Sequence, residues 1–172
     1  MSAENKHGIL IALDDSEASV QTLRYVAHMT QGRPEFRARL LHMLPVVPPA
    51  LLEHGGSGDA AVEAELDKQL REARQRWISQ AEQEAQPLFD RAKRQLEAAG
   101  FAPTDIETEC RASISGMAVA RDCIEAARDS GCRTVAIGRT LLPWYHEVFH
   151  THPCDELVKH AEGLTIWIVE WV

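Results

Sequence analysis

Three histidines and a cysteine near the end of the chain are the residues best suited to bind a metal ion. His146, His150, His152 and Cys154 follow one another as H-x3-H-x-H-x-C within nine residues. Imidazole and thiolate are the ligand types that Zn²⁺ and similar ions prefer, and four of them would complete a tetrahedral structural site. The spacing is not that of a familiar zinc module, so solvated loop histidines are the alternative. The stretch therefore predicts a transition-metal site as a hypothesis to test.

A second polar group follows the first apolar run of the chain. Asp14 and Ser16 come directly after the run "HGILIAL" and before a pattern typical of a helix. Their side-chain oxygens can accept hydrogen bonds from the first free amides of that helix. We therefore expect them at least to cap the helix. No nucleophile elbow, Walker motif or HExxH accompanies them, so the sequence indicates no catalytic residue.

Charge and cysteine usage limit the class of protein. The chain has 18 Lys and Arg residues against 26 Asp and Glu residues, a net charge of −8, which argues against binding nucleic acid or anionic membranes. No apolar run reaches the roughly 20 residues of a membrane span, and the N-terminus lacks the features of a signal peptide. The four cysteines show no CxxC spacing and are expected as thiols. A cytoplasmic protein is the expectation.

Strand and helix patterns alternate along the whole chain. Short apolar runs predict strands, and the segments between them have apolar residues at helical spacing. The resulting order, βαβαβαβαβ, predicts one α/β domain over residues 1–172, with five parallel strands and helices on both faces of the sheet. The predicted strands are residues 7–13, 36–44, 105–110 and 164–172, and residues 131–138 are a Gly-bounded loop that enters a buried strand.

The longest helical pattern covers residues 59–99. Its apolar positions keep a 3.6-residue step throughout, which would give one helix about 60 Å long at 1.5 Å per residue. Pro87 lies inside this pattern, lacks an amide N–H and clashes with the preceding turn. We therefore expect a kink at Pro87, or two helices that share one phase. A coiled coil is the alternative, because charged residues flank the apolar stripe.

These patterns resemble the universal stress protein family over nearly the whole chain. "ILIALDDSEASVQTLRYV" is similar to the first strand and Asp-containing turn of that family, and "LLHML" to its second strand. "VAIGR" and "DELVKHAEGLTIWIV" resemble its last two strands and the helix between them. The resemblance implies a Rossmann-like sheet of order 3-2-1-4-5, as in the adenine nucleotide alpha hydrolases. It also implies a homodimer, and a family divided into members that bind ATP and members that do not.

The turn after the fourth strand departs from the ATP-binding pattern of that family. The pattern is Gly, two residues, Gly, nine residues, Gly and then Ser or Thr; here the four positions are Gly138, Leu141, Thr151 and His152. Leu and Thr hinder the close backbone approach that glycine permits, and Pro153 removes an amide beside the phosphates. The resemblance nevertheless places a set of positions at the nucleotide: Asp14, Ser16, Met43, Gly138, Thr140, Thr151 and His152.

The sequence therefore predicts a universal stress protein that acts in stress adaptation through a homodimer and through contacts with a protein partner not identified by sequence. ATP binding is expected to be reduced or absent. The alternative is an adenine-nucleotide switch or slow ATPase that uses Asp14 and a reshaped phosphate loop. The dimer is expected on the C-terminal strand, which is apolar on both faces and, in the order that the resemblance implies, lies at an edge. In the alternative to that dimer, the long helix around Trp77 or an N-terminal segment covers the edge.

Overall fold

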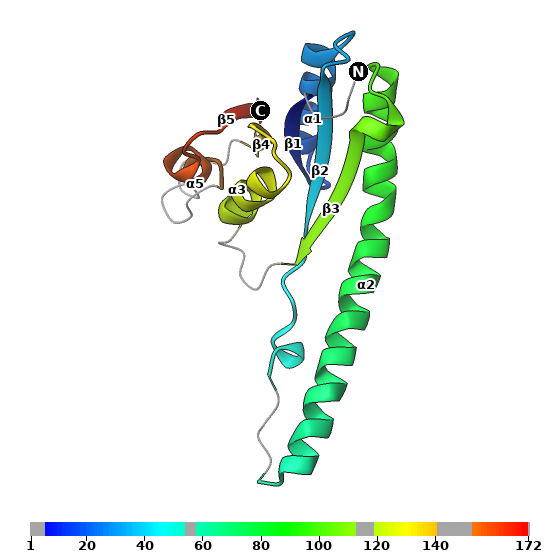
Figure 1. Cartoon of the computed structure of the whole chain (residues 1–172), viewed down its shortest axis with the longest axis vertical. Helices are drawn as coiled ribbons and strands as arrows, with labels where there is room; N and C mark the ends of the chain where they lie inside the picture. Colours follow the sequence, from blue (N-terminus) through cyan, green and yellow to red (C-terminus); the bar gives the residue numbers. More distant parts are fainter. Residues whose placement is uncertain (1–5, 54–57, 113–118, 141–152, 172) are drawn as a thin grey trace.

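The computed structural model describes residues 6–53, 58–112, 119–140 and 153–171. Within them a five-stranded parallel sheet has the order β3-β2-β1-β4-β5 (Figure 1). This confirms the predicted fold class and the order that the family resemblance implied. The strands are β1 (His7–Leu13), β2 (Phe36–Leu44), β3 (Ile106–Ala112), β4 (Thr134–Thr140) and β5 (Thr165–Trp171).

Helices cover both faces of the sheet, as the alternating pattern predicted. On one face α1 (Glu17–Thr30) and the C-terminal part of α2 (Ala60–Ala98) enclose a core with β1 and β2. On the other face α3 (Val119–Asp129) and α5 (Pro153–His160) enclose a second core. Strand β1 serves both cores, because Ile9, Leu10 and Ile11 are all 0% exposed. Two short 3-10 helices, η2 (Pro49–Leu51) and η3 (Pro103–Asp105), lie in the connections.

Helix α2 continues through Pro87. The structure has one helix of 39 residues that passes through Pro87, so the alternative of two helices is wrong (Figure 1). Pro87 is exposed, whereas Ala85 and Phe89 on either side of it are buried against the sheet. The missing N–H therefore faces water, which can bond the carbonyl left free one turn earlier. Packing of the neighbouring residues holds the helix together across the proline.

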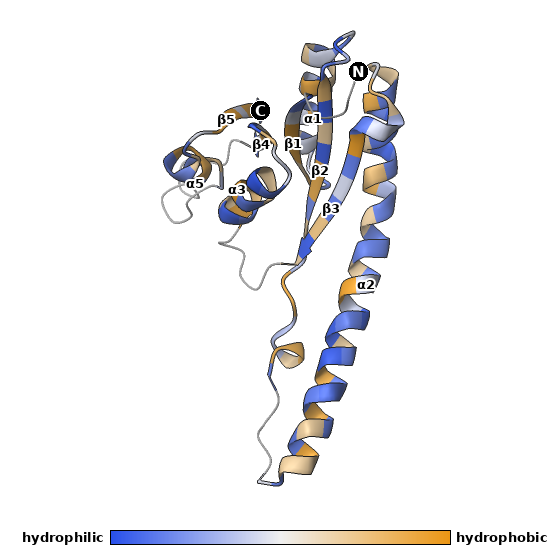
Figure 2. Cartoon of the chain, in the orientation of Figure 1, coloured by the Kyte–Doolittle hydropathy of each residue, from blue (hydrophilic) through white to orange (hydrophobic). Residues whose placement is uncertain are grey.

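The N-terminal half of α2 projects beyond the sheet as an arm (Figure 1). The buried residues of α2 begin only at Ala81, so residues 60–80, hereafter the arm, bury no side chain completely. The chain that leaves β2 runs beside the arm, and Arg74 fixes it by donating from Nε to the Leu51 carbonyl (2.9 Å) and from Nη2 to the Leu52 carbonyl (3.2 Å). Figure 2 shows apolar residues recurring along this largely hydrophilic helix. In the described ranges neither α2 nor another helix is long and apolar enough to span a membrane.

Candidate functional site

A cavity of about 350 Å³ opens at the carboxyl ends of β1 and β4. The strand order reverses its direction between these two strands, and parallel sheets place their ligand sites at such a point. Four of the positions implied by the family resemblance line it: Asp14, Ser16, Met43 and Gly138. The other lining residues are Ala12, Leu13, Ala18, Ser19, Leu41, Val119, Ile137 and Pro153.

Asp14 and Ser16 have a structural role in the wall of this cavity. The Asp14 carboxylate accepts a hydrogen bond from the Ser16 amide (2.8 Å), and the Ser16 hydroxyl accepts one from the Ser19 amide (3.2 Å). The Ser19 hydroxyl in turn accepts from the Asp14 amide (3.0 Å). Ser16 is thus the N-cap of α1, which confirms the capping expectation. The same three residues face the cavity, so capping and ligand binding are compatible roles.

Gly138 is explained by packing alone. A Cβ built on Gly138 would lie 2.6 Å from both the carbonyl carbon and the carbonyl oxygen of Ala18. Only glycine lets β4 approach the first turn of α1 this closely. A glycine at this position is therefore required by the contact between strand and helix, whether or not a phosphate binds nearby.

The electrostatics of the cavity favour a neutral ligand over a polyanion. Among the described residues that line it, Asp14 is the one carboxylate and there is no basic side chain. Arg139 follows Gly138 in the chain, but its Nη1 lies 3.6 Å from Asp155 and 3.8 Å from Glu170. Its charge is therefore already shared with two carboxylates, and the remaining lining is largely apolar.

The other positions of the predicted nucleotide site are only partly described. Thr140 is the last residue of β4 and pairs with Trp171 of β5. Leu141, Thr151 and His152 lie outside the described residues, so the phosphate side of the predicted site stays a prediction.

The structure places one of the four predicted metal ligands. Cys154 lies in α5, is 0% exposed, and its Sγ donates to the Gly138 carbonyl at 3.7 Å. Burial raises the pKa of the Cys154 thiol to about 11, which disfavours the thiolate that a metal requires. His146, His150 and His152 lie outside the described residues, and the described ones contain no cluster of three or more potential ligands. The metal site stays a prediction.

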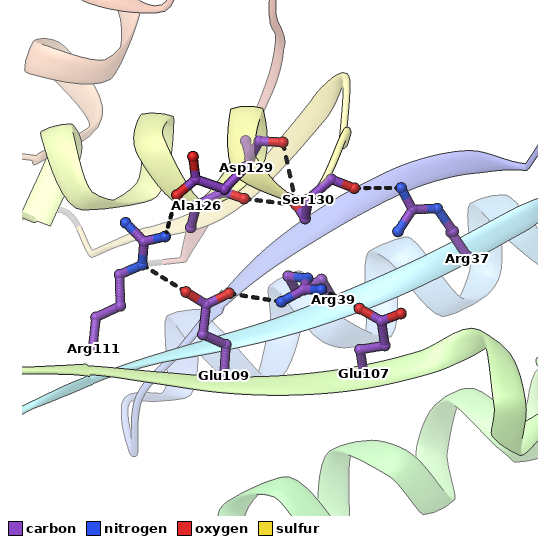
Figure 3. A network of polar contacts seen from close by, with 9 residues as sticks. Arg37, Arg39, Glu107, Glu109, Arg111, Ala126, Asp129 and Ser130 are labelled. Atoms are coloured by element: carbon purple, nitrogen blue, oxygen red, sulfur yellow. Dashed lines mark hydrogen bonds and ion pairs between the residues drawn. The ribbon is translucent and has the colours of Figure 1, made fainter.

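Sequence reasoning missed a charged network on the face of the sheet that carries α3 (Figure 3). Glu109 of β3 accepts from Arg111 Nε at 2.6 Å and from Arg39 Nη1 at 2.8 Å, and Arg39 also pairs with Glu107. Arg111 reaches Asp129 of α3 at 2.8 Å. The alternation of charged residues at 107, 109 and 111 was the available signal, because alternate residues of a strand share a face. These mutual pairs join β2, β3 and α3, so we assign the network a structural role.

Comparison with known proteins gives a match at the level of structure. No family model matches the sequence, and no curated protein is a significant match. Among solved structures, the hypothetical protein MJ0577, whose biochemical function was assigned from its structure, shares 17% identity over 98% of both chains with a TM-score of 0.66. Universal stress protein UspA from Lactobacillus plantarum shares 16% identity over 96% of this chain and 98% of that chain, with a TM-score of 0.60.

The chain has the universal stress protein fold. A universal stress protein from Archaeoglobus fulgidus, solved in complex with dAMP, adds a third match at 13% identity, with a TM-score of 0.52 over 96% of this chain and 98% of that one. The likeness covers almost the full length of each chain, so the universal stress protein fold accounts for the whole described sheet and its four main helices.

Proposed function

We propose that this chain is a universal stress protein that acts in stress adaptation through contacts with a second copy and with other proteins, and that it binds ATP poorly or not at all. The observation that carries the proposal is the lining of the cavity at β1 and β4: one carboxylate and no basic side chain among its described residues. These residues offer a triphosphate no basic side chain to offset its charge, and the Asp14 carboxylate adds a further negative charge to the same cavity.

The same cavity suits the neutral part of a nucleotide. Met43, Leu41 and Ile137 offer apolar contact to a base, and Asp14 can accept hydrogen bonds from sugar hydroxyls. The relative from Archaeoglobus fulgidus was solved with dAMP, which has one phosphate rather than three. We therefore propose that any adenine ligand of this chain is held by its nucleoside part, with the phosphates contributing little.

A nucleotide-dependent switch or slow ATPase is the second candidate function. Its support is the position of Asp14 at the cavity. The carboxyl-terminal part of β4 and the start of α5 also line this cavity, through Gly138 and Pro153. It requires that the chain between these ends supply the phosphate contacts that the described lining lacks. The two functions differ in whether the γ-phosphate adds affinity.

We place the homodimer contact on β5. In the described sheet β5 pairs only with β4, so its other edge is open. Trp171 is 41% exposed, and Trp167 packs edge-on against Tyr25, which is itself 43% exposed. Helix α2 packs on β2 and β3, at the other end of the strand order, which argues against the alternative in which the helix around Trp77 covers the β5 edge. The alternative of an N-terminal segment falls on residues 1–5, outside the described residues, and stays a prediction. Pairing with the β5 of a second copy would satisfy this edge and close as a two-fold dimer.

We also propose that the protein works in the cytoplasm. All four cysteines, Cys110, Cys123, Cys132 and Cys154, are free thiols, as a reducing compartment favours.

The nucleotide content of the purified protein tests the proposed function. Protein isolated without added nucleotide is denatured, and the supernatant is analysed by chromatography for adenine nucleotides. Our proposal expects no ATP, and at most a substoichiometric amount of adenosine or its monophosphate. Stoichiometric ATP or ADP would refute it and support the nucleotide switch.

A further inference from the structure

The arm of α2 carries an apolar stripe. This stripe lies on a different side of the helix from the residues of α2 that pack in the core. The stripe consists of Val62, Leu66, Leu70, Ala73 and Trp77, spaced by three or four residues. At about 100° of rotation per residue, its centre lies roughly 100° around the helix from the buried residues that begin at Ala81. The stripe is thus not an extension of the core contact.

In the described part of the chain, the connection beside the arm is held on one side of this stripe. Arg74, which holds the carbonyls of Leu51 and Leu52, lies about 80° around the helix from the stripe centre. Val62 remains 48% exposed, and Leu66, Leu70 and Trp77 are half-buried. A helix without a fully buried side chain is marginal in water, because most helical stability in proteins comes from packing an apolar face. The described residues thus leave part of the stripe available for a further contact.

We propose that the arm pairs antiparallel with the arm of a second copy, centred on Leu70. On one flank of the stripe, acidic Glu65 lies in the first half of the arm and basic Arg76 lies in the second half. Antiparallel pairing brings the acidic part of each arm against the basic part of the other. Parallel pairing would place like charges together, which is destabilising.

The register follows from the length of the arm. Residue 70 is the midpoint of residues 60–80, which span about 30 Å at 1.5 Å per residue. With Leu70 facing its own copy, residue 66 is level with residue 74 and residue 62 with residue 78. Leu66 therefore lies beside Ala73 and Val62 beside Trp77, so on either side of Leu70 a larger side chain meets a smaller one. Glu65 and Arg76 lie on one flank of the stripe. In this register, Glu65 of each copy faces Arg76 of the other copy across the interface. Each arm then ends where the partner's α2 enters its own core at Ala81.

Charge exchange on the full-length chain tests the pairing. Glu65→Arg and Arg76→Glu should each weaken arm pairing by about tenfold or more, because each places like charges across both ends of the interface. An equimolar mixture of the two variants should restore association, since every cross-interface pair is again of opposite sign. Lys68→Glu on the far side of the helix is the control and should leave association unchanged. A mixture that does not restore association, or a Lys68→Glu variant as weak as the other two, would overturn the proposal.

Disulfide trapping distinguishes this contact from the β5 dimer and fixes the direction of the helices. Leu70→Cys should form a covalent dimer under mild oxidation, and a mixture of Leu66→Cys with Ala73→Cys should do the same. Leu66→Cys alone and Gln75→Cys, which lies away from the stripe, should not. Cross-linking of Leu66→Cys alone would indicate parallel arms and overturn the register. Leu70→Cys protein that forms no disulfide-linked dimer at tens of micromolar, with its circular dichroism unchanged, would show that the arm does not meet its own copy.

Discussion

Gly138 of β4 and Ala18 of α1 are in direct backbone contact: a side chain added to Gly138 would lie 2.6 Å from the Ala18 carbonyl carbon and oxygen. This contact gives the candidate cavity its shape, because both residues line it. It also shows that a glycine can be needed at this position for folding, independently of any need for phosphate binding. In this chain the folding requirement is sufficient to explain the residue.

Gly138→Ala should therefore destabilise the protein even without nucleotide. The added methyl group must displace backbone atoms rather than a flexible side chain, so the free energy of unfolding should fall by about 1–3 kcal/mol. Urea denaturation of the two proteins measures the difference. Gly58→Ala is a matched control, because nothing lies within 4 Å of a Cβ built at that glycine. Equal midpoints for Gly138→Ala and the natural protein would show that the contact is wrong.

Pairing through β5 predicts a concentration-dependent dimer that depends on the exposed strand. Trp171→Lys places a charge on the edge strand at a side chain that is 41% exposed, so it should weaken the dimer with little loss of fold stability. Sedimentation equilibrium at tens of micromolar, roughly the range in which a standard-sized interface is saturated, checks this. Arg128→Glu, on α3, is the surface control. A variant that dimerises as tightly as the natural chain would place the contact elsewhere.

Ile168→Pro and Val169→Pro extend the test within the strand. Successive amides of a strand point to opposite sides, so one substitution should remove a bond to β4 and the other a bond to the partner copy. One variant should lose stability and the other should mainly lose association. Two variants with the same profile would contradict edge pairing.

The buried thiols predict a loss of stability at alkaline pH. Burial raises the pKa of Cys154 to about 11 and that of Cys123 to about 12. In the unfolded chain the pKa of both thiols is about 8.5. The contribution of the two thiols to the free energy of unfolding is complete below that pH. It is lost as the pH rises through the pKa of the folded state, since the unfolded state releases protons that the native state retains. Urea midpoints measured from pH 8 to about 10.5 should fall less steeply for Cys154→Ala than for the natural chain. Parallel curves would exclude a pKa raised this far.

The histidine and cysteine stretch predicts one bound transition-metal ion. Binding would have to displace the protons of three imidazoles and of the Cys154 thiol, so affinity should fall below about pH 6 and should rise with alkalinity. Elemental analysis of protein prepared without an affinity tag and supplied with Zn²⁺ gives the stoichiometry. Cys154→Ser should lower it if the thiol is a ligand. Less than one tenth of an equivalent of Zn, Ni or Cu in the natural protein would end the metal hypothesis.

Much of the fold could be predicted because most of its strands, though not the charged strand β3, are short apolar runs bounded by turn residues. Strand β1 is an example: buried on both faces, it reads as a nearly continuous apolar run. Helix α2 was harder, because Pro87 is a break signal in the sequence and its tolerance depends on facing solvent. Only the structure shows that Ala85 and Phe89 hold the helix on either side of it.

The candidate site was predictable in position but not in chemistry. Asp14 and Ser16 could be placed at the start of a helix from their side chains alone. The structure confirms Ser16 as the N-cap, whereas Asp14 accepts a hydrogen bond from the Ser16 amide. The role of Gly138 could not be inferred, because contact with Ala18 depends on how two elements far apart in the chain approach each other. The ion pairs between β2 and β3 were hidden for the same reason, since register between strands is set by tertiary structure.

Calorimetric titration with ATP and Mg²⁺, run beside adenosine, tests the central claim most directly. Each charged phosphate contact that is lost costs about 1.5–3 kcal/mol, so loss of several should move a micromolar site beyond millimolar. We predict no measurable heat from ATP at micromolar concentrations, and an affinity for ATP no greater than that for adenosine. Asp14→Asn should weaken the binding of adenosine. It should not make the binding of ATP weaker than it is in the natural chain. A dissociation constant for ATP near or below about ten micromolar would contradict the account and favour the nucleotide switch.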